Sequence, residues 1–166
     1  GRIEAVLPTA EARLRYDARE TLDRLHHVLL PGLVNAHTHA AMVPSRWVDP
    51  EYVRDGTELA IAEMLRGGIT CFADMHLWPD VVARTAAAAQ MRASVGLVVT
   101  EAATSWAATA DEYIDRGMRL RDEYKGDPLI STHFAPHSPY SASDATLARV
   151  RRLADELDLP VALHLH

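Results

Sequence analysis

The pair His37-Thr38-His39 is the part of this sequence best suited to chemistry, because two imidazoles one residue apart can bind a single metal ion. In a β-strand, residues i and i+2 point to the same face, so both rings can converge on one ion. The pair follows the apolar run 31–36, which reads as a turn and then a buried strand that leaves the core at the histidines. The alternative is that one histidine caps a loop while the other lies in solvent.

Further histidines follow two later apolar runs. His133 and His137 come at the end of the fourth expected strand, and His164 and His166 end the fifth. The carboxyl ends of parallel strands form the active-site face of a strand–helix barrel, so ligands distant in the sequence can meet there. Catalytic zinc takes three protein ligands and leaves a position for water, which two histidines from one strand and one from another would satisfy. Alternation places His164 and His166 on the same face, so either could be the third ligand.

Strand and helix patterns alternate along the chain and must position these histidines. After Asp49-Pro50, apolar residues recur at helical spacing until Gly67-Gly68, which predicts a helix. The run 94–100 is too continuously apolar for a one-sided sheet and indicates an α/β fold with a parallel sheet. The remaining patterns predict strands after residue 32 and at 69–74, 129–134 and 161–165, helices at 79–90, 109–125 and 141–157, and two short strands at 2–7 and 27–30.

Composition narrows the class of protein. The chain has 166 residues, of which 48% are hydrophobic, so it can bury a core. Its net charge of -6 and the lack of a basic run argue against nucleic-acid binding, and no apolar stretch is long enough to span a bilayer. Cys71 is the only cysteine, so no internal disulfide can form and a reducing, cytoplasmic setting is expected, with Cys71 itself as a buried, inert thiol.

Four segments of the chain resemble, in the same order, motifs of the amidohydrolase superfamily. They are residues 30–42 around the histidine pair, 67–75, 135–140 (Ala-Pro-His-Ser-Pro-Tyr) and 159–166. They are similar to the branch of 5-methylthioadenosine/S-adenosylhomocysteine deaminases and related chlorohydrolases. Together they cover most of the chain and are specific to that branch.

The resemblance implies a role for each histidine of these motifs. His37, His39 and His164 correspond to the ligands of one divalent metal ion, zinc or alternatively iron, and His166 becomes a neighbour and not a ligand. His137 corresponds to a histidine that contacts the nucleoside substrate. The expected partner is therefore a small nucleoside or heterocyclic amine, with no nucleic acid and no membrane, and a homo-oligomer is left open.

The chain also departs from the pattern of this branch. The catalytic glutamate would fall at position 167, just past His166, so no catalytic residue is expected within the chain, and a further histidine and an aspartate ligand on later strands are absent. About twenty family residues have no counterpart between Arg46 and Trp47. We therefore expect residues 33–166 to form the N-terminal part of a (β/α)8 TIM barrel, about five of its eight units, and residues 1–32 to form part of a small β-sandwich-like domain.

Three functions are compatible with these residues. The first is hydrolytic deamination of an adenine nucleoside, with loss of ammonia from the ring carbon. The second is the same site acting on other rings, as an s-triazine chlorohydrolase or aminohydrolase or as a guanine deaminase, because only pocket residues would differ. The third is a catalytically dead metal-binding fragment, since the chain has three candidate ligands and lacks the proton shuttle.

Overall fold

The computed structural model describes residues 3–41 and 48–165 of the chain. The chain divides into two units, Gly1–Pro31 and Gly32–His166, which are described separately. The junction between Arg46 and Trp47, where the sequence predicts missing residues, lies outside the described residues, and so does His166.

The first unit contains one short helix. This helix, α1, spans Thr9–Arg15 and buries none of its residues. The short strands expected at 2–7 and 27–30 do not form in the described part of this unit, where Val6 is 88% and Leu29 92% exposed. Two short strands without further strands or a helix to cover them are marginal in water, which accounts for the error. The assignment of this segment to a small β-sandwich-like domain stays a prediction.

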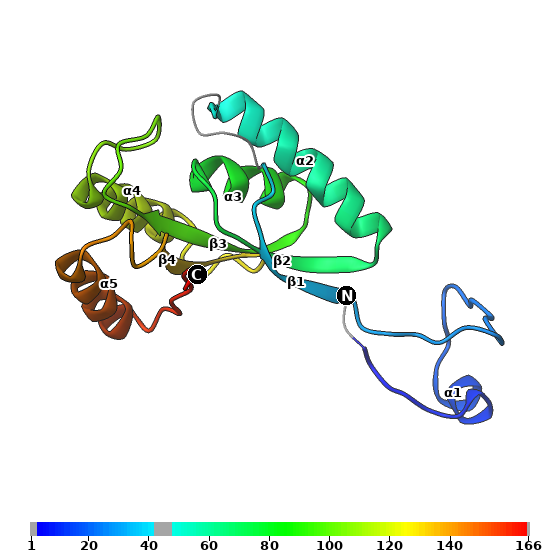
Figure 1. Cartoon of the computed structure of the whole chain (residues 1–166). Coiled ribbons are helices and arrows are strands. Elements are labelled where there is room, and N and C mark those ends of the chain that lie inside the picture. The colour runs from blue at the N-terminus through cyan, green and yellow to red at the C-terminus, as the bar shows by residue number, and fades with distance from the viewer. Residues whose placement is uncertain (1–2, 42–47, 166) are drawn as a thin grey trace. The chain divides into compact units, whose positions relative to one another are not determined.

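The second unit is built on a parallel sheet (Figure 1). Its strands are β1 (Leu33–Thr38), β2 (Ile69–Asp74), β3 (Arg92–Val99) and β4 (Ile130–Pro136), hydrogen-bonded in the order β1-β2-β3-β4. This order, with a helix after each strand, confirms the α/β class expected from the sequence. The fifth strand predicted at 161–165 is wrong as a full strand, because only an isolated parallel bridge joins Val161 to Phe134 of β4.

Three of the four helices described in the second unit begin at a residue whose side chain caps the helix. The four helices are α2 (Pro50–Arg66), α3 (Pro79–Ala88), α4 (Ala110–Glu123) and α5 (Asp144–Leu157). The side chains of Asp49, Thr109 and Ser143 accept hydrogen bonds from backbone N–H groups in the first turns of α2, α4 and α5. No helix in the described residues is both long enough and apolar enough to cross a membrane.

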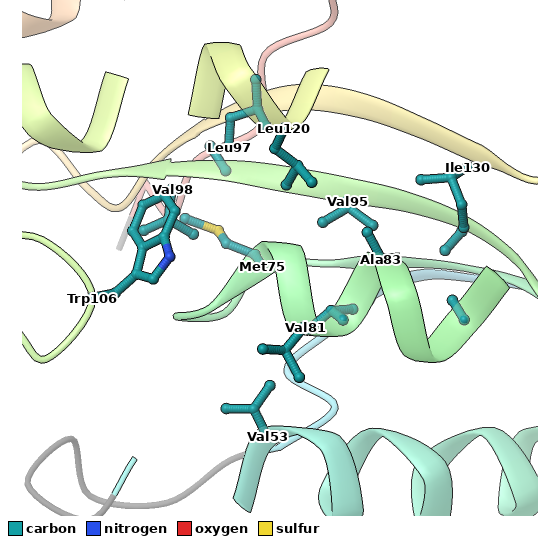
Figure 2. Close-up of a cluster of buried hydrophobic side chains, with 14 of the residues drawn as sticks. Val53, Met75, Val81, Ala83, Val95, Leu97, Val98, Trp106, Leu120 and Ile130 are labelled. Atoms are coloured by element: carbon teal, nitrogen blue, oxygen red, sulfur yellow. The ribbon is translucent and has the colours of Figure 1, made fainter. Parts of the chain in front are cut away.

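The core lies between the sheet and its helices. Val95 and Leu97 of β3 are almost fully buried, and they belong to the apolar cluster drawn in Figure 2. On β2 the burial alternates, with Phe72 and Asp74 buried and Cys71 partly exposed. The sequence expectation of a buried thiol is therefore wrong, because Cys71 lies on the face of the sheet opposite to Phe72.

Candidate metal centre

Three histidines from the two ends of the second unit converge at the carboxyl edge of the sheet. His37 and His39 come from the end of β1, and His164 follows the bridge beside β4. The Nε2 atom of His164 lies 3.1 Å from Nε2 of His37 and 3.2 Å from Nε2 of His39. Each of the three offers one ligand atom within 4.8 Å of the others, so the cluster could hold a metal ion.

Backbone carbonyls fix the orientation of two of these rings. Nδ1 of His39 hydrogen-bonds to the carbonyl oxygen of Met75, and Nδ1 of His164 lies 3.1 Å from the carbonyl oxygen of His137. A carbonyl only accepts, so in both neutral rings Nδ1 carries the proton and Nε2 presents its lone pair to the cluster. Metal-bound histidines characteristically show this arrangement, in which the second nitrogen donates to a backbone carbonyl.

The segment that carries His164 runs alongside β4 although it forms no full strand. Phe134 donates its backbone N–H to the carbonyl of Pro160, and Ala162 donates to the carbonyl of Phe134, both at 2.9 Å. The N–H of His164 then donates to the carbonyl of His137 at 3.2 Å. The first two bonds have the spacing of a parallel ladder, and the third is displaced by one residue toward His137. Together they place His164 at the same edge as the β1 pair.

The surroundings of His37 favour its neutral form. Partial burial, together with the neighbouring imidazoles of His39 and His164, lowers the pKa of His37 below its ordinary value. A histidine must be unprotonated to bind a metal ion, so the lowered pKa favours ligation at neutral pH.

His137 lies next to the three histidines but is not one of them. Its ring centroid is 5.4 Å from that of His164, and its Nδ1 lies 2.9 Å from the hydroxyl oxygen of Ser141. Its backbone N–H donates to the carbonyl of Val99, which ties the turn after β4 to the end of β3. His137 is therefore held half-buried beside the cluster by Ser141 and Val99.

Two further histidines, His133 and His76, lie outside the cluster of three. His133 does not join the cluster: it lies on β4 opposite Gly96, is buried, and its Nδ1 is 2.9 Å from the hydroxyl oxygen of Ser94. A Cβ at Gly96 would lie 2.8 Å from the carbonyl oxygen of Asp74, 2.9 Å from Cβ of Ala135 and 3.3 Å from Nε2 of His133, so the glycine allows the neighbouring strands and this ring to approach closely. His76, which the sequence analysis did not single out, lies after β2 with its ring centroid 6.5 Å from that of His39.

Asp74 is a buried carboxyl beside the histidine pair that the sequence analysis did not single out. It ends β2, is 1% exposed, and accepts a hydrogen bond at 2.8 Å from the N–H of Ala40, the residue after the histidine pair. Its second carboxylate oxygen, Oδ2, is buried without a hydrogen-bond partner. Burial raises the pKa of Asp74 to about 7, against the lowering effect of the Ala40 bond. The sequence signal that could have identified Asp74 is an ionisable residue at the end of an otherwise apolar strand.

We expect Asp74→Asn to stabilise the metal-free chain at pH 8 and to lose that advantage toward pH 5. The folded-state pKa of about 7 lies above the ordinary value of 3.8, so between these values the folded state binds a proton that the unfolded state lacks. Stability of the natural chain therefore falls as pH rises through this window and levels off above it. The amide carries no charge to bury, so at pH 8 the variant should gain at least about 1 kcal/mol, or about 2–4 °C in Tm.

Thermal unfolding followed by circular dichroism at pH 5, 6, 7 and 8 measures this difference. Asp115→Asn, at an exposed position of α4, is the matched control and should show little dependence on pH. A gain for Asp74→Asn that is the same at every pH would contradict the assignment of a buried, readily protonated carboxyl.

Comparison with known proteins identifies relatives along almost the whole chain. Residues 28–166 match the amidohydrolase family. A 5-methylthioadenosine/S-adenosylhomocysteine deaminase from Teredinibacter turnerae is 41% identical over 99% of this chain, and one from Saccharophagus degradans is 37% identical over 100% of it. The chain spans 42% of the length of both relatives. The aligned spans of 187 and 188 positions exceed the 166 residues of the chain, so these relatives contain residues without a counterpart here.

Solved structures are also similar to this chain. A crystal structure of an adenosine deaminase from Xanthomonas campestris with bound zinc superposes with a TM-score of 0.92 at 46% identity, covering 96% of this chain and 42% of that one. A triazine hydrolase from Arthobacter aurescens superposes with a TM-score of 0.72 at 18% identity, covering 82% of this chain and 41% of that one, which is a likeness of fold alone. Together with the match over residues 28–166, these relationships confirm the resemblance seen in the sequence, and this chain belongs to the amidohydrolase family.

Proposed function

We propose that the whole protein is a zinc-dependent hydrolase that deaminates adenine nucleosides of the 5-methylthioadenosine and S-adenosylhomocysteine type, and that this chain supplies three of its metal ligands. The observation that carries the proposal is the convergence of the Nε2 atoms of His37, His39 and His164. The names of the relatives from Teredinibacter turnerae and Xanthomonas campestris support the same reaction class.

The donor set fits zinc. Three neutral imidazoles from two strand ends match the His-rich ligand sets of catalytic zinc sites, and iron, which also accepts imidazole, is the alternative ion. When bound, such an ion supplies a Lewis acid that lowers the pKa of a coordinated water toward neutrality.

The chain's own residues orient the site. The carbonyls of Met75 and His137 hold the Nδ1 protons of His39 and His164, so their Nε2 atoms stay directed at the ion. Among the described residues no carboxylate joins the ligand cluster. We therefore place the proton-transferring carboxylate outside these residues, at the glutamate expected just past His166.

The proposal includes the setting in which the protein works. A lone cysteine that cannot form an internal disulfide favours the reducing cytoplasm. Because the carboxylate and further ligands are expected beyond this stretch, we expect the 166-residue chain alone to bind zinc and to release no ammonia from nucleosides.

Ammonia release by the whole protein tests the substrate class. Parallel assays would measure ammonia from 5-methylthioadenosine, S-adenosylhomocysteine, adenosine and guanine, and chloride from a chlorotriazine, all at equal concentration. We expect the two thio-nucleosides to have the highest kcat/KM and the chlorotriazine to release no chloride. If the nucleosides are inert while guanine or the triazine is turned over, the proposed substrate class is wrong. The assignment of the metal ligands would not be affected by that result.

We expect His137→Ala in the whole protein to keep its zinc and to lose catalytic efficiency. His137 is held by Ser141 and Val99 and does not belong to the ligand cluster. Its replacement therefore removes the bond to Ser141 and the proposed contact to substrate, and leaves the three metal ligands in place. The loss of one hydrogen bond to a polar substrate group raises the activation free energy by about 1–3 kcal/mol, which lowers kcat/KM roughly 5- to 150-fold. Steady-state kinetics with parallel zinc analysis measures both effects, and a loss of zinc in this variant would assign His137 to the metal.

A further inference from the structure

We propose that Asp74 is a positioning residue that holds His39 in its ligating orientation by binding the backbone just after it. The proposal rests on the proposed function, in which His39 is a metal ligand. Asp74 itself is not a ligand in this account, because it does not belong to the cluster of ligand atoms within 4.8 Å.

Asp74 and Met75 make three hydrogen bonds to His39 and its two chain neighbours. Oδ1 of Asp74 accepts the N–H of Ala40 at 2.8 Å, on the C-terminal side of the histidine. The N–H of Met75 donates to the carbonyl of Thr38 at 3.0 Å, on the N-terminal side. The carbonyl of Met75 accepts from Nδ1 of the His39 ring itself. We call these three bonds the His39 clamp.

The clamp lies where regular strand pairing fails. The parallel register between β1 and β2 is interrupted between Asn35 and Thr38, and the last paired residues are Thr38 and Asp74. Beyond that point no strand ladder orients Ala40, so its N–H depends on the carboxylate of Asp74. A side chain here replaces the backbone bond that a longer strand would have supplied.

Burial makes the clamp rigid. Asp74 is 1% exposed, and the side chain of Met75 is 4% exposed within the apolar cluster of Figure 2. Neither residue can move without opening the core, so the carbonyl of Met75 is a fixed acceptor. Oδ2 of Asp74 has no partner, so this carboxyl is buried at a cost in stability that the Ala40 bond only partly offsets.

The test compares Asp74→Ala and Asp74→Asn in the whole 166-residue chain. Asparagine keeps an oxygen that can accept from Ala40, whereas alanine removes it. Val82→Ala, at a fully buried position of α3 that makes none of the three bonds of the clamp, is the control for a general loss of stability. One readout is the affinity for Zn²⁺, measured by competition with a chromogenic chelator. The other is the pair of ¹⁵N shifts of the His39 ring in the metal-free chain at pH 8, which reports its tautomer.

We expect Asp74→Ala to bind Zn²⁺ about 10- to 100-fold more weakly, the loss typical of outer-shell partners, and to show tautomer averaging at His39. Asp74→Asn and Val82→Ala should stay within about threefold of the natural affinity and keep the Nδ1–H tautomer. If Asp74→Ala and Val82→Ala lose stability equally and neither changes affinity or tautomer, Asp74 is only structural and the proposal is overturned.

Hydrogen exchange decides the proposal even if Asp74→Ala fails to fold. In the natural chain and in Asp74→Asn, the amide of Ala40 should exchange far more slowly than an exposed amide, and fast exchange in either would contradict the clamp. The same experiments separate this proposal from the proposed function. A chain that binds no Zn²⁺ overturns the metal site, while Ala40 protection and the His39 tautomer still test the clamp.

Discussion

Replacing both His37 and His39 by alanine should abolish tight zinc binding by the chain. The two rings supply two of the three Nε2 atoms that lie within reach of one ion, and the remaining His164 cannot chelate alone. We expect the affinity for Zn²⁺ to fall by at least about 10³-fold, equivalent to about 4 kcal/mol. Isothermal titration of the metal-free protein and elemental analysis after dialysis measure the loss.

The matched control for the double substitution lies in the same chain. His26 and His27 form a second pair of nearby histidines and are exposed in the N-terminal unit. Their double replacement by alanine should leave the zinc affinity unchanged. Undiminished metal in the His37/His39 variant, or an equal loss in the His26/His27 variant, would remove the assignment of the site.

Truncation of Phe134 to alanine should give the largest loss of folding stability. Phe134 is 0% exposed in β4, and its backbone also holds the segment that carries His164 through bonds to Pro160 and Ala162. A buried phenylalanine replaced by alanine loses its apolar burial and leaves a cavity, which costs about 3–5 kcal/mol. Urea unfolding followed by circular dichroism measures the change in the free energy of unfolding.

An exposed apolar residue serves as the control for this loss. Leu59 of α2 is 63% exposed, so Leu59→Ala should change the free energy of unfolding by no more than about 0.5 kcal/mol. A similarly small effect for Phe134→Ala would show that the side chain of Phe134 is not packed in the core.

Most of the fold was predictable because local signals agree with the tertiary structure. Asp49 and Thr109 cap the helices that their positions predict, and the apolar run on β3 forms the central part of a parallel sheet. The strands at 2–7 and 27–30 and the full strand at 161–165 could not be predicted correctly, because strand formation depends on partners that a local pattern does not reveal. The segment at 161–165 nevertheless lies beside β4 as expected.

The candidate site was predictable only in its ligand atoms. The spacing of His37 and His39 predicted that both lie on one face. The strand-end rule predicted His164 or His166 at the same edge, and the resemblance to the amidohydrolase superfamily selected His164. The structure brings His37, His39 and His164 together. Asp74 also ends a strand, so the same rule could have singled it out. Its bond to Ala40 could not be predicted, because that bond depends on an interruption of the β1–β2 register that no sequence pattern reveals. His133 shows the opposite error, since it ends an apolar run but is buried against Ser94.

X-ray absorption at the zinc edge of the zinc-loaded chain tests the central claim most directly. The account predicts a shell of three nitrogen scatterers at about 2.0–2.1 Å, with the multiple-scattering pattern of imidazole rings. The same spectrum from the His37/His39 double variant should lose that pattern. A first shell of sulfur from Cys71, or one of oxygen atoms without imidazole scattering, would contradict the assignment of His37, His39 and His164 as the metal ligands.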